Sequence, residues 1–289
     1  MTTIDFKALA QRAKETGPDL TKAQSGGGDY VPPVEGATRL RFVGYIEQGI
    51  HTSVWQGNAK VKPRAHFIFE LSGPKHPPRE HEGKKYPQLI SFDEVVGRHE
   101  KNGYMKLFAK MSVDTPGATN FVELLGNAYR GTVSHSKSKD GKKTYANLKS
   151  DSVYNINSTS YEDPDSGELR KVQVDEAITP LKVFLWDYAD LAQWDALFID
   201  GKYDDGGSKN KFQEKIKAAE NIVGSPIFEA LVEANREEEL TPAPKGTGPA
   251  EDEQPDEDAP AKPEAPAKAA PVKNALAEDD GADPLAAMG

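Results

Sequence analysis

The sequence contains no cysteine, which excludes a disulfide scaffold, a thiolate zinc site and a thiol nucleophile. It also contains no run near the length of about eighteen apolar residues that a membrane-spanning helix needs. Residues 1–22 lack the apolar core of a secretory signal peptide. These absences predict a protein of a reducing cytoplasm without a membrane partner.

The sequence motifs of common enzyme classes are also missing. No Walker loop, dinucleotide-binding glycine pattern, nucleophile elbow or zinc-protease helix occurs. Acidic groups within 162–165 and 200–205 could hold magnesium for a nuclease, but both segments are turn-like and typical of solvated loops. His76, His81 and His99 match no zinc-binding spacing. We predict a non-enzymatic protein with no metal or cofactor, and a nuclease is the distant alternative.

The carboxyl-terminal residues 241–289 are the poorest in core-forming side chains. They hold nine of the 21 prolines, thirteen alanines, no aromatic residue and a net charge of −7. Such a composition cannot bury enough apolar surface to offset the entropy lost on ordering. We expect a disordered acidic tail.

Charge is distributed unevenly along the chain, whose net charge is −10. Residues 36–150 carry +9, whereas residues 151–240 carry −11. A basic half joined to an acidic half is typical of proteins with a polyanionic partner. The alternative is that charge simply fluctuates along a soluble chain.

Alternating apolar residues predict β-strands in the centre of the chain. The segment 65–71 directs Ala65, Phe67, Phe69 and Leu71 to one side. In 38–46, strict alternation places Leu40, Phe42, Gly44 and Ile46 on one face and Arg39, Arg41, Val43 and Tyr45 on the other. Residues 129–135 and 143–156 form the clearest hairpin, because Asp140-Gly141 between two β-prone runs is a strong turn signal.

Helices are predicted on both sides of these strands. Apolar spacing indicates helices over 104–111 and 208–223, and Asp190 and Ser225 can cap two more. A short helix and a flexible linker are expected within 1–35. The predicted organisation is this terminal element, an α+β but mainly β domain over 36–240, and the tail 241–289.

The hairpin 129–154 combines lysines at its turn with interleaved tyrosines. Single-stranded nucleic acid is held by cations along its phosphates and by aromatic rings under its bases, so this composition favours such a ligand. An ordinary solvated hairpin is the competing interpretation. Similar concentrations of cations and aromatics occur in 39–64. The predicted nucleic-acid-binding residues are Arg39, Arg41, Tyr45, Trp55, Lys60, Lys62, Arg64, Arg130, Lys137, Lys139, Lys142, Lys143, Tyr145 and Lys149, with Tyr45, Trp55 and Tyr145 stacking on bases.

The runs LLGNAYRGTV, SKDGKKTYANLKS and WDYADLAQWDALF, together with the acidic terminus, resemble bacteriophage single-stranded DNA-binding proteins. The resemblance implies an OB-fold-like five-stranded β-barrel with added helices, which coats and protects single-stranded DNA without sequence specificity. It also implies a role in replication, recombination and repair in the host bacterial cytoplasm.

In that family the acidic tail recruits a polymerase, helicase or nuclease. The tail residues that the resemblance assigns to partner binding are Glu278, Asp279, Asp280, Asp283, Leu285 and Met288. A homodimer is an open alternative for the oligomeric state. The rival function is a protein-interaction adaptor or phage structural protein that works through the acidic half.

Overall fold

The computed structural model describes residues 31–55, 58–81, 83–138, 140–202 and 207–242. The predicted amino-terminal helix and the residues of the acidic tail beyond 242 lie outside this part of the chain. In the part that is described, no helix is both long enough and apolar enough to cross a membrane.

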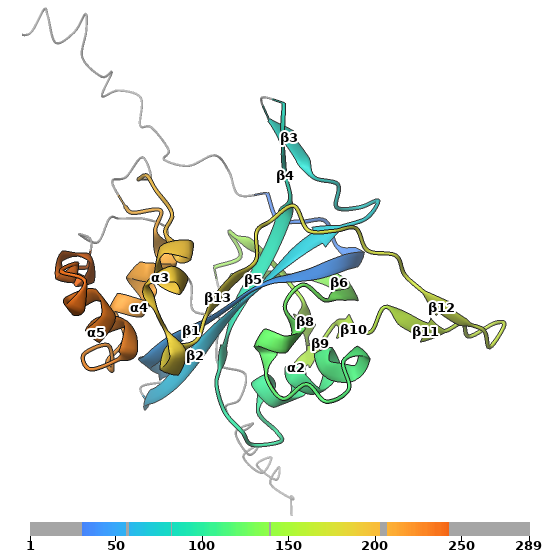
Figure 1. Cartoon of the computed structure of the whole chain (residues 1–289). Helices are drawn as coiled ribbons and strands as arrows, with labels where there is room; N and C mark the ends of the chain where they lie inside the picture. Colours follow the sequence, from blue (N-terminus) through green and yellow to red (C-terminus); the bar gives the residue numbers. More distant parts are fainter. Residues whose placement is uncertain (1–30, 56–57, 82, 139, 203–206, 243–289) are drawn as a thin grey trace, which may run out of the picture. The chain divides into compact units, whose positions relative to one another are not determined.

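The described residues form a mainly β structure with added helices, as the sequence predicts (Figure 1). The strands are β1 (Gly36–Trp55), β2 (Asn58–Ser72), β3 (Arg79–His81), β4 (Lys84–Tyr86), β5 (Gln88–Val95), β6 (Ala128–Lys137), β7 (Thr144–Asn147), β8 (Lys149–Ser150), β9 (Val153–Tyr154), β10 (Ile156–Asn157), β11 (Ser160–Glu162), β12 (Leu169–Lys171) and β13 (Lys182–Phe184). The helices are α2 (Gly103–Met111), α3 (Leu191–Leu197), α4 (Lys211–Lys217) and α5 (Pro226–Glu233), with 3₁₀ turns η1 (Ser112–Asp114), η2 (Phe121–Leu124), η3 (Trp186–Tyr188) and η4 (Glu237–Leu240).

One large sheet contains most of the long strands. Its order is β10–β6–β1–β2–β5, with antiparallel pairing between neighbours. Strand β7 continues the sheet beside β6, and β13 pairs parallel to β1. Within the described residues β5 forms no ladder with β7 or β10, so the expected closed barrel is not found.

The inward face of β2 confirms the alternation predicted for 65–71. The side chains of Ala65, Phe67, Phe69 and Leu71 are at most 1% exposed. They pack with α2 and η2 in one hydrophobic cluster, in which the Phe67 and Phe121 ring centroids lie 4.8 Å apart. This cluster is the main core of the protein.

Strand β1 departs from the predicted alternation. A β-bulge lies between Phe42 and Gly44, and an extra residue on one strand moves the side chains that follow it to the opposite face, here as far as the second register shift between Glu47 and Gly49. Tyr45 therefore enters the main core, where it is 2% exposed, while Val43 and Ile46 point to the opposite face. The prediction that Tyr45 stacks on bases is wrong, because its ring is enclosed and its hydroxyl contacts Glu47 and Tyr104.

A second hydrophobic cluster covers part of the outward face of the sheet. It joins Val43, Ile46 and Ile68 to β13 and to α3, α4 and α5. Asp190 caps α3 and Ser225 caps α5, as predicted, because their side chains accept hydrogen bonds from backbone N–H groups of the first turn. The helix predicted over 208–223 is shorter, since only Lys211–Lys217 is α-helical.

The predicted hairpin is confirmed as the β6–β7 pair, with Lys137 opposite Thr144 at its last ladder position. Gly141 adopts a φ of +71° in the turn, a left-handed conformation that glycine accommodates without strain. The chain then returns through β10 to the outer edge of β6.

Candidate functional site

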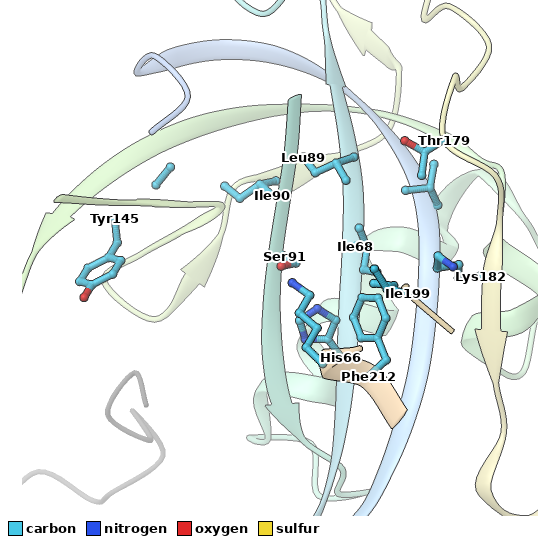
Figure 2. Close-up of a pocket in the computed structure, with 13 residues that line it drawn as sticks. His66, Ile68, Leu89, Ile90, Ser91, Tyr145, Thr179, Lys182, Ile199 and Phe212 are labelled. Carbon is cyan, nitrogen blue, oxygen red and sulfur yellow. The ribbon is translucent and has the colours of Figure 1, made fainter. Parts of the chain in front are cut away.

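A pocket of about 450 Å³ opens on the outward face of β2 and β5 (Figure 2). Its floor is Ile68 and Ser91, whose strands pair directly at these two positions. Segments distant in sequence supply its walls: β7 contributes Tyr145, the β13 region Thr179 and Lys182, and α4 Lys211 and Phe212. This volume is within the range of about 300–1,000 Å³ that is usual for ligand pockets.

His66 presents a buried ring nitrogen at this pocket. Its Nδ1 lies 2.5 Å from Asp93 Oδ1, whereas its Nε2 is buried and has no hydrogen-bond partner among the described residues. Thr179 Oγ1, in the same pocket, is also buried without a described partner. Leaving a buried polar atom unsatisfied costs about 1–3 kcal/mol, so a polar ligand that reached these atoms would be stabilised.

Asp93 fixes the orientation of the His66 ring. Burial alone would raise the pKa of Asp93, but the hydrogen bond and charge of His66, with the charges of Lys215 and Arg64, outweigh it and hold the pKa below its ordinary value. Gln48 Nε2 donates a second hydrogen bond of 3.2 Å to the same Oδ1 atom. The imidazole is thus held through its Nδ1 atom, and the residue lines the pocket.

Two lysines give the pocket a positive charge. Lys182 Nζ donates to the carbonyl of Ala196 at 2.6 Å, and partial burial lowers the pKa of Lys182. Lys211 Nζ lies 5.2 Å from the ring centroid of Phe212, so a cation and an aromatic ring stand together at the pocket. Apolar, aromatic and cationic groups on one concave surface suit a ligand with flat rings and negative charge.

A row of cations leads along β2 to this pocket. Lys60, Lys62 and Arg64 alternate along the strand in phase with His66, so the four side chains share the outward face. Burial lowers the pKa of His51, which pairs with Lys62, and the charges of Lys215 and Arg64 lower it further.

Some of the predicted binding residues lie at this surface, whereas others are held by contacts elsewhere in the fold. Tyr145 lines the pocket, and Lys137, Lys142 and Lys143 lie at the exposed end of the β6–β7 hairpin. Lys149 is instead held by Glu94, at 3.3 Å, and by the Tyr154 ring, at 5.1 Å. Lys139 and the side chain of Trp55 lie outside the described residues.

The Arg41 side chain is engaged in hydrogen bonds within the fold. Its guanidinium donates to the carbonyls of Gly126, Val174 and Asp175, at 2.8 to 3.1 Å. It pairs with Glu176 at 3.5 Å. Because these contacts hold residues 174–176 against β1, we assign Arg41 to the fold, which corrects the prediction that it binds phosphate. Arg39 and Arg130 lie together in a separate pocket.

Sequence reasoning missed four residues of the pocket: His66, Lys182, Lys211 and Phe212. No local motif marks them, because they come from three elements that only the tertiary fold brings together. The outward phase of His66 in β2 was the one available signal, since alternation placed it opposite the phenylalanines.

Comparison with known proteins finds no matching family model, no matching curated protein and no matching solved structure.

Proposed function

We propose that this protein binds single-stranded DNA without sequence specificity, on the outward face of β2 and β5, and that it is not an enzyme. The observation that carries the proposal is a single pocket that is lined by two aromatic residues, Tyr145 and Phe212, and by two lysines, Lys182 and Lys211. Bases stack on aromatic rings regardless of their identity, and lysines neutralise phosphates, so the two requirements of such binding meet at one place.

The strand order supports an OB-like arrangement, open between β5 and β7. Five strands in the order β7–β6–β1–β2–β5, with α2 inserted between β5 and β6, follow the path of a five-stranded Greek-key barrel. OB folds bind oligonucleotides on the face of their second and third strands, between the first and fourth hairpin loops. Here that face is β2 and β5, which is where the pocket lies.

The loops of this arrangement carry the remaining cations. Lys60 and Lys62 follow the β1–β2 turn, and Lys142 and Lys143 precede β7. A strand of DNA crossing the pocket would meet positive charge at both ends of its path. Each phosphate neutralised in this way makes the affinity depend on salt.

The tail extends the proposal to regulation and partners. With a charge of −7, residues 241–289 would compete with DNA for the basic surface at the high effective concentration of a tethered segment. Once DNA displaces it, the tail would be free to recruit a replication enzyme. With this role the protein would act in phage or bacterial DNA replication, recombination and repair.

Fluorescence anisotropy across a salt series tests the proposal with the full-length chain, a labelled oligo(dT) of about 30 nucleotides and a duplex of equal length. We expect tighter binding of oligo(dT), and a log–log salt slope that falls by about 1.4 in the double variant Lys62→Gln/Lys211→Gln. The matched control Lys101→Gln/Lys106→Gln removes two exposed lysines at α2 and should keep the wild-type slope. Equal affinity for duplex, or no binding at low salt, would overturn the proposal.

A further inference from the structure

A second pocket, of about 350 Å³, lies where the beginning of β1 meets β6. Two arginines line it, one from each strand, and Arg39 and Arg130 are direct partners in the β1–β6 ladder. Directly paired residues of an antiparallel ladder project from the same face at close distance. The two guanidinium groups therefore open on one surface.

This pairing places like charges opposite each other, an arrangement that destabilises a sheet. Arg130 is partly compensated: its Nε donates to the carbonyl of Ser158 at 2.8 Å, and its Cζ lies 4.8 Å from the ring centroid of Tyr161. For Arg39, the described residues provide no hydrogen bond or ion pair to the guanidinium. An anion bound between the two arginines would offset the repulsion between their guanidinium groups, which the described residues do not fully neutralise.

The rest of the pocket is polar and suited to an oxyanion. Ser72 pairs with Arg39 on the other side of β1, and its hydroxyl is buried without a described hydrogen-bond partner. Thr132 and Asn157 add a hydroxyl and an amide from β6 and β10. Guanidinium forks with nearby hydroxyl donors match the geometry of phosphate.

The chain segment 172–179 contributes to both pockets, one at each of its ends. Arg41 holds residues 174–175 by their carbonyls, and the Glu70 carboxylate accepts the backbone N–H groups of Ile178 and Thr179 at 2.9 and 2.7 Å. Thr179 then enters the first pocket, whereas Val172 lines the second. The two pockets therefore meet opposite ends of the segment 172–179, and they share no lining residue.

We propose that the Arg39–Arg130 pocket is a second phosphate site, which takes a phosphodiester of a DNA strand that extends beyond the first pocket. This inference rests on the proposed function and adds a longer path for the strand. It predicts that short oligonucleotides use only the first pocket, and that longer ones also use the second.

The test compares oligo(dT) of about 5 and about 30 nucleotides, lengths at the lower end of and beyond the usual site size of one OB fold. With the full-length chain, Arg39→Gln should bind the longer oligonucleotide about three- to tenfold more weakly, with a salt slope smaller by about 0.7. Its affinity for the short oligonucleotide should equal that of the wild type. Arg39→Lys should keep the wild-type slope, because the charge remains.

The outcomes separate this inference from the function on which it rests. If wild type binds both oligonucleotides and Arg39→Gln shows an unchanged slope with the longer one, the second site is refuted and the first stands. An equal loss for both lengths would also refute it, because Arg39 would then act on the first pocket. If wild type binds neither length, both proposals fail. Circular dichroism of each variant establishes that the fold is retained.

Discussion

The two faces of β2 differ in whether their side chains find all of their packing and hydrogen-bond partners within the chain. The inward residues Ala65, Phe67, Phe69 and Leu71 are apolar and pack in the main core. Within residues 64–70, the outward residues are Arg64, His66, Ile68 and Glu70, of which three are polar although all are largely buried. Glu70 finds partners within the chain, whereas His66 keeps one nitrogen without a described partner. The comparison teaches that the inward face determines the fold, and that the polar atoms without described partners on the outward face mark the surface on which we propose that DNA binds.

The largest expected effect comes from breaking the inward face. Phe67→Ala would remove a ring that stacks near Phe42, Phe92 and Phe121, and should lower the free energy of unfolding by about 3–5 kcal/mol. Urea denaturation measures this loss. Ser91→Ala, on the outward face of β5, is the comparator and should change stability by about 0.5 kcal/mol or less. Similar losses in the two variants would contradict the contrast between the faces.

Substitution of Glu70 tests the part of the outward face whose polar groups have hydrogen-bond partners within the chain. Glu70→Ala would leave the N–H groups of Ile178 and Thr179 without their acceptor, at a cost of about 1–3 kcal/mol. Amide hydrogen exchange should show faster exchange at these two residues than in the wild type. Unchanged protection there would mean that Glu70 does not hold the segment.

Tyr145 separates stacking from charge in the pocket. Tyr145→Ala should weaken oligo(dT) binding by about 1–3 kcal/mol, the usual contribution of one stacked base, and leave the salt slope unchanged. Tyr145→Phe keeps the ring and should bind like wild type. Anisotropy titrations at several salt concentrations measure both quantities, and a changed slope in Tyr145→Ala would argue against a stacking role.

The smallest expected effect is a change in acid sensitivity at the His66–Asp93 pair. Because the folded-state pKa of Asp93 is lowered, its contribution to stability is present above the ordinary carboxyl pKa of 3.8 and is lost as the pH falls through the lower folded value. Asp93→Asn should therefore flatten the decline in stability at acidic pH. Thermal unfolding between about pH 2 and 6 measures this, with Asp200→Asn at an exposed position as the control. An equally steep decline in Asp93→Asn would exclude the linkage.

Much of the fold could be predicted from local sequence patterns, because alternation of apolar residues indicates burial, and turn and capping residues indicate where elements end or begin. Alternation identified the inward face of β2, Asp140-Gly141 identified the β6–β7 turn, and Ser225 marked the start of α5. The bulge after Phe42 was not readable, since alternation carries no signal for an inserted residue, and Tyr45 was placed on the wrong face as a result.

The candidate site was less predictable than the fold for a physical reason. Tyr145 was found because aromatics and lysines cluster within its own hairpin. Lys182 and Lys211 were not found, since they reach the pocket only when β13 and α4 pack on the sheet. Arg41 is an error of the opposite kind. Its position in a basic stretch predicted a binding residue, but in the fold its guanidinium donates hydrogen bonds to backbone carbonyl groups.

Photocrosslinking tests the central claim most directly. The full-length protein would be irradiated with oligo(dT) that contains 4-thiothymidine, and the attached residues identified by mass spectrometry. If DNA binds on the outward face of β2 and β5, crosslinks are expected at Tyr145, His66 and Phe212. These crosslinks should disappear when unlabelled oligo(dT) is in excess. Crosslinks confined to other surfaces, with none at the residues of this pocket, would contradict the claim.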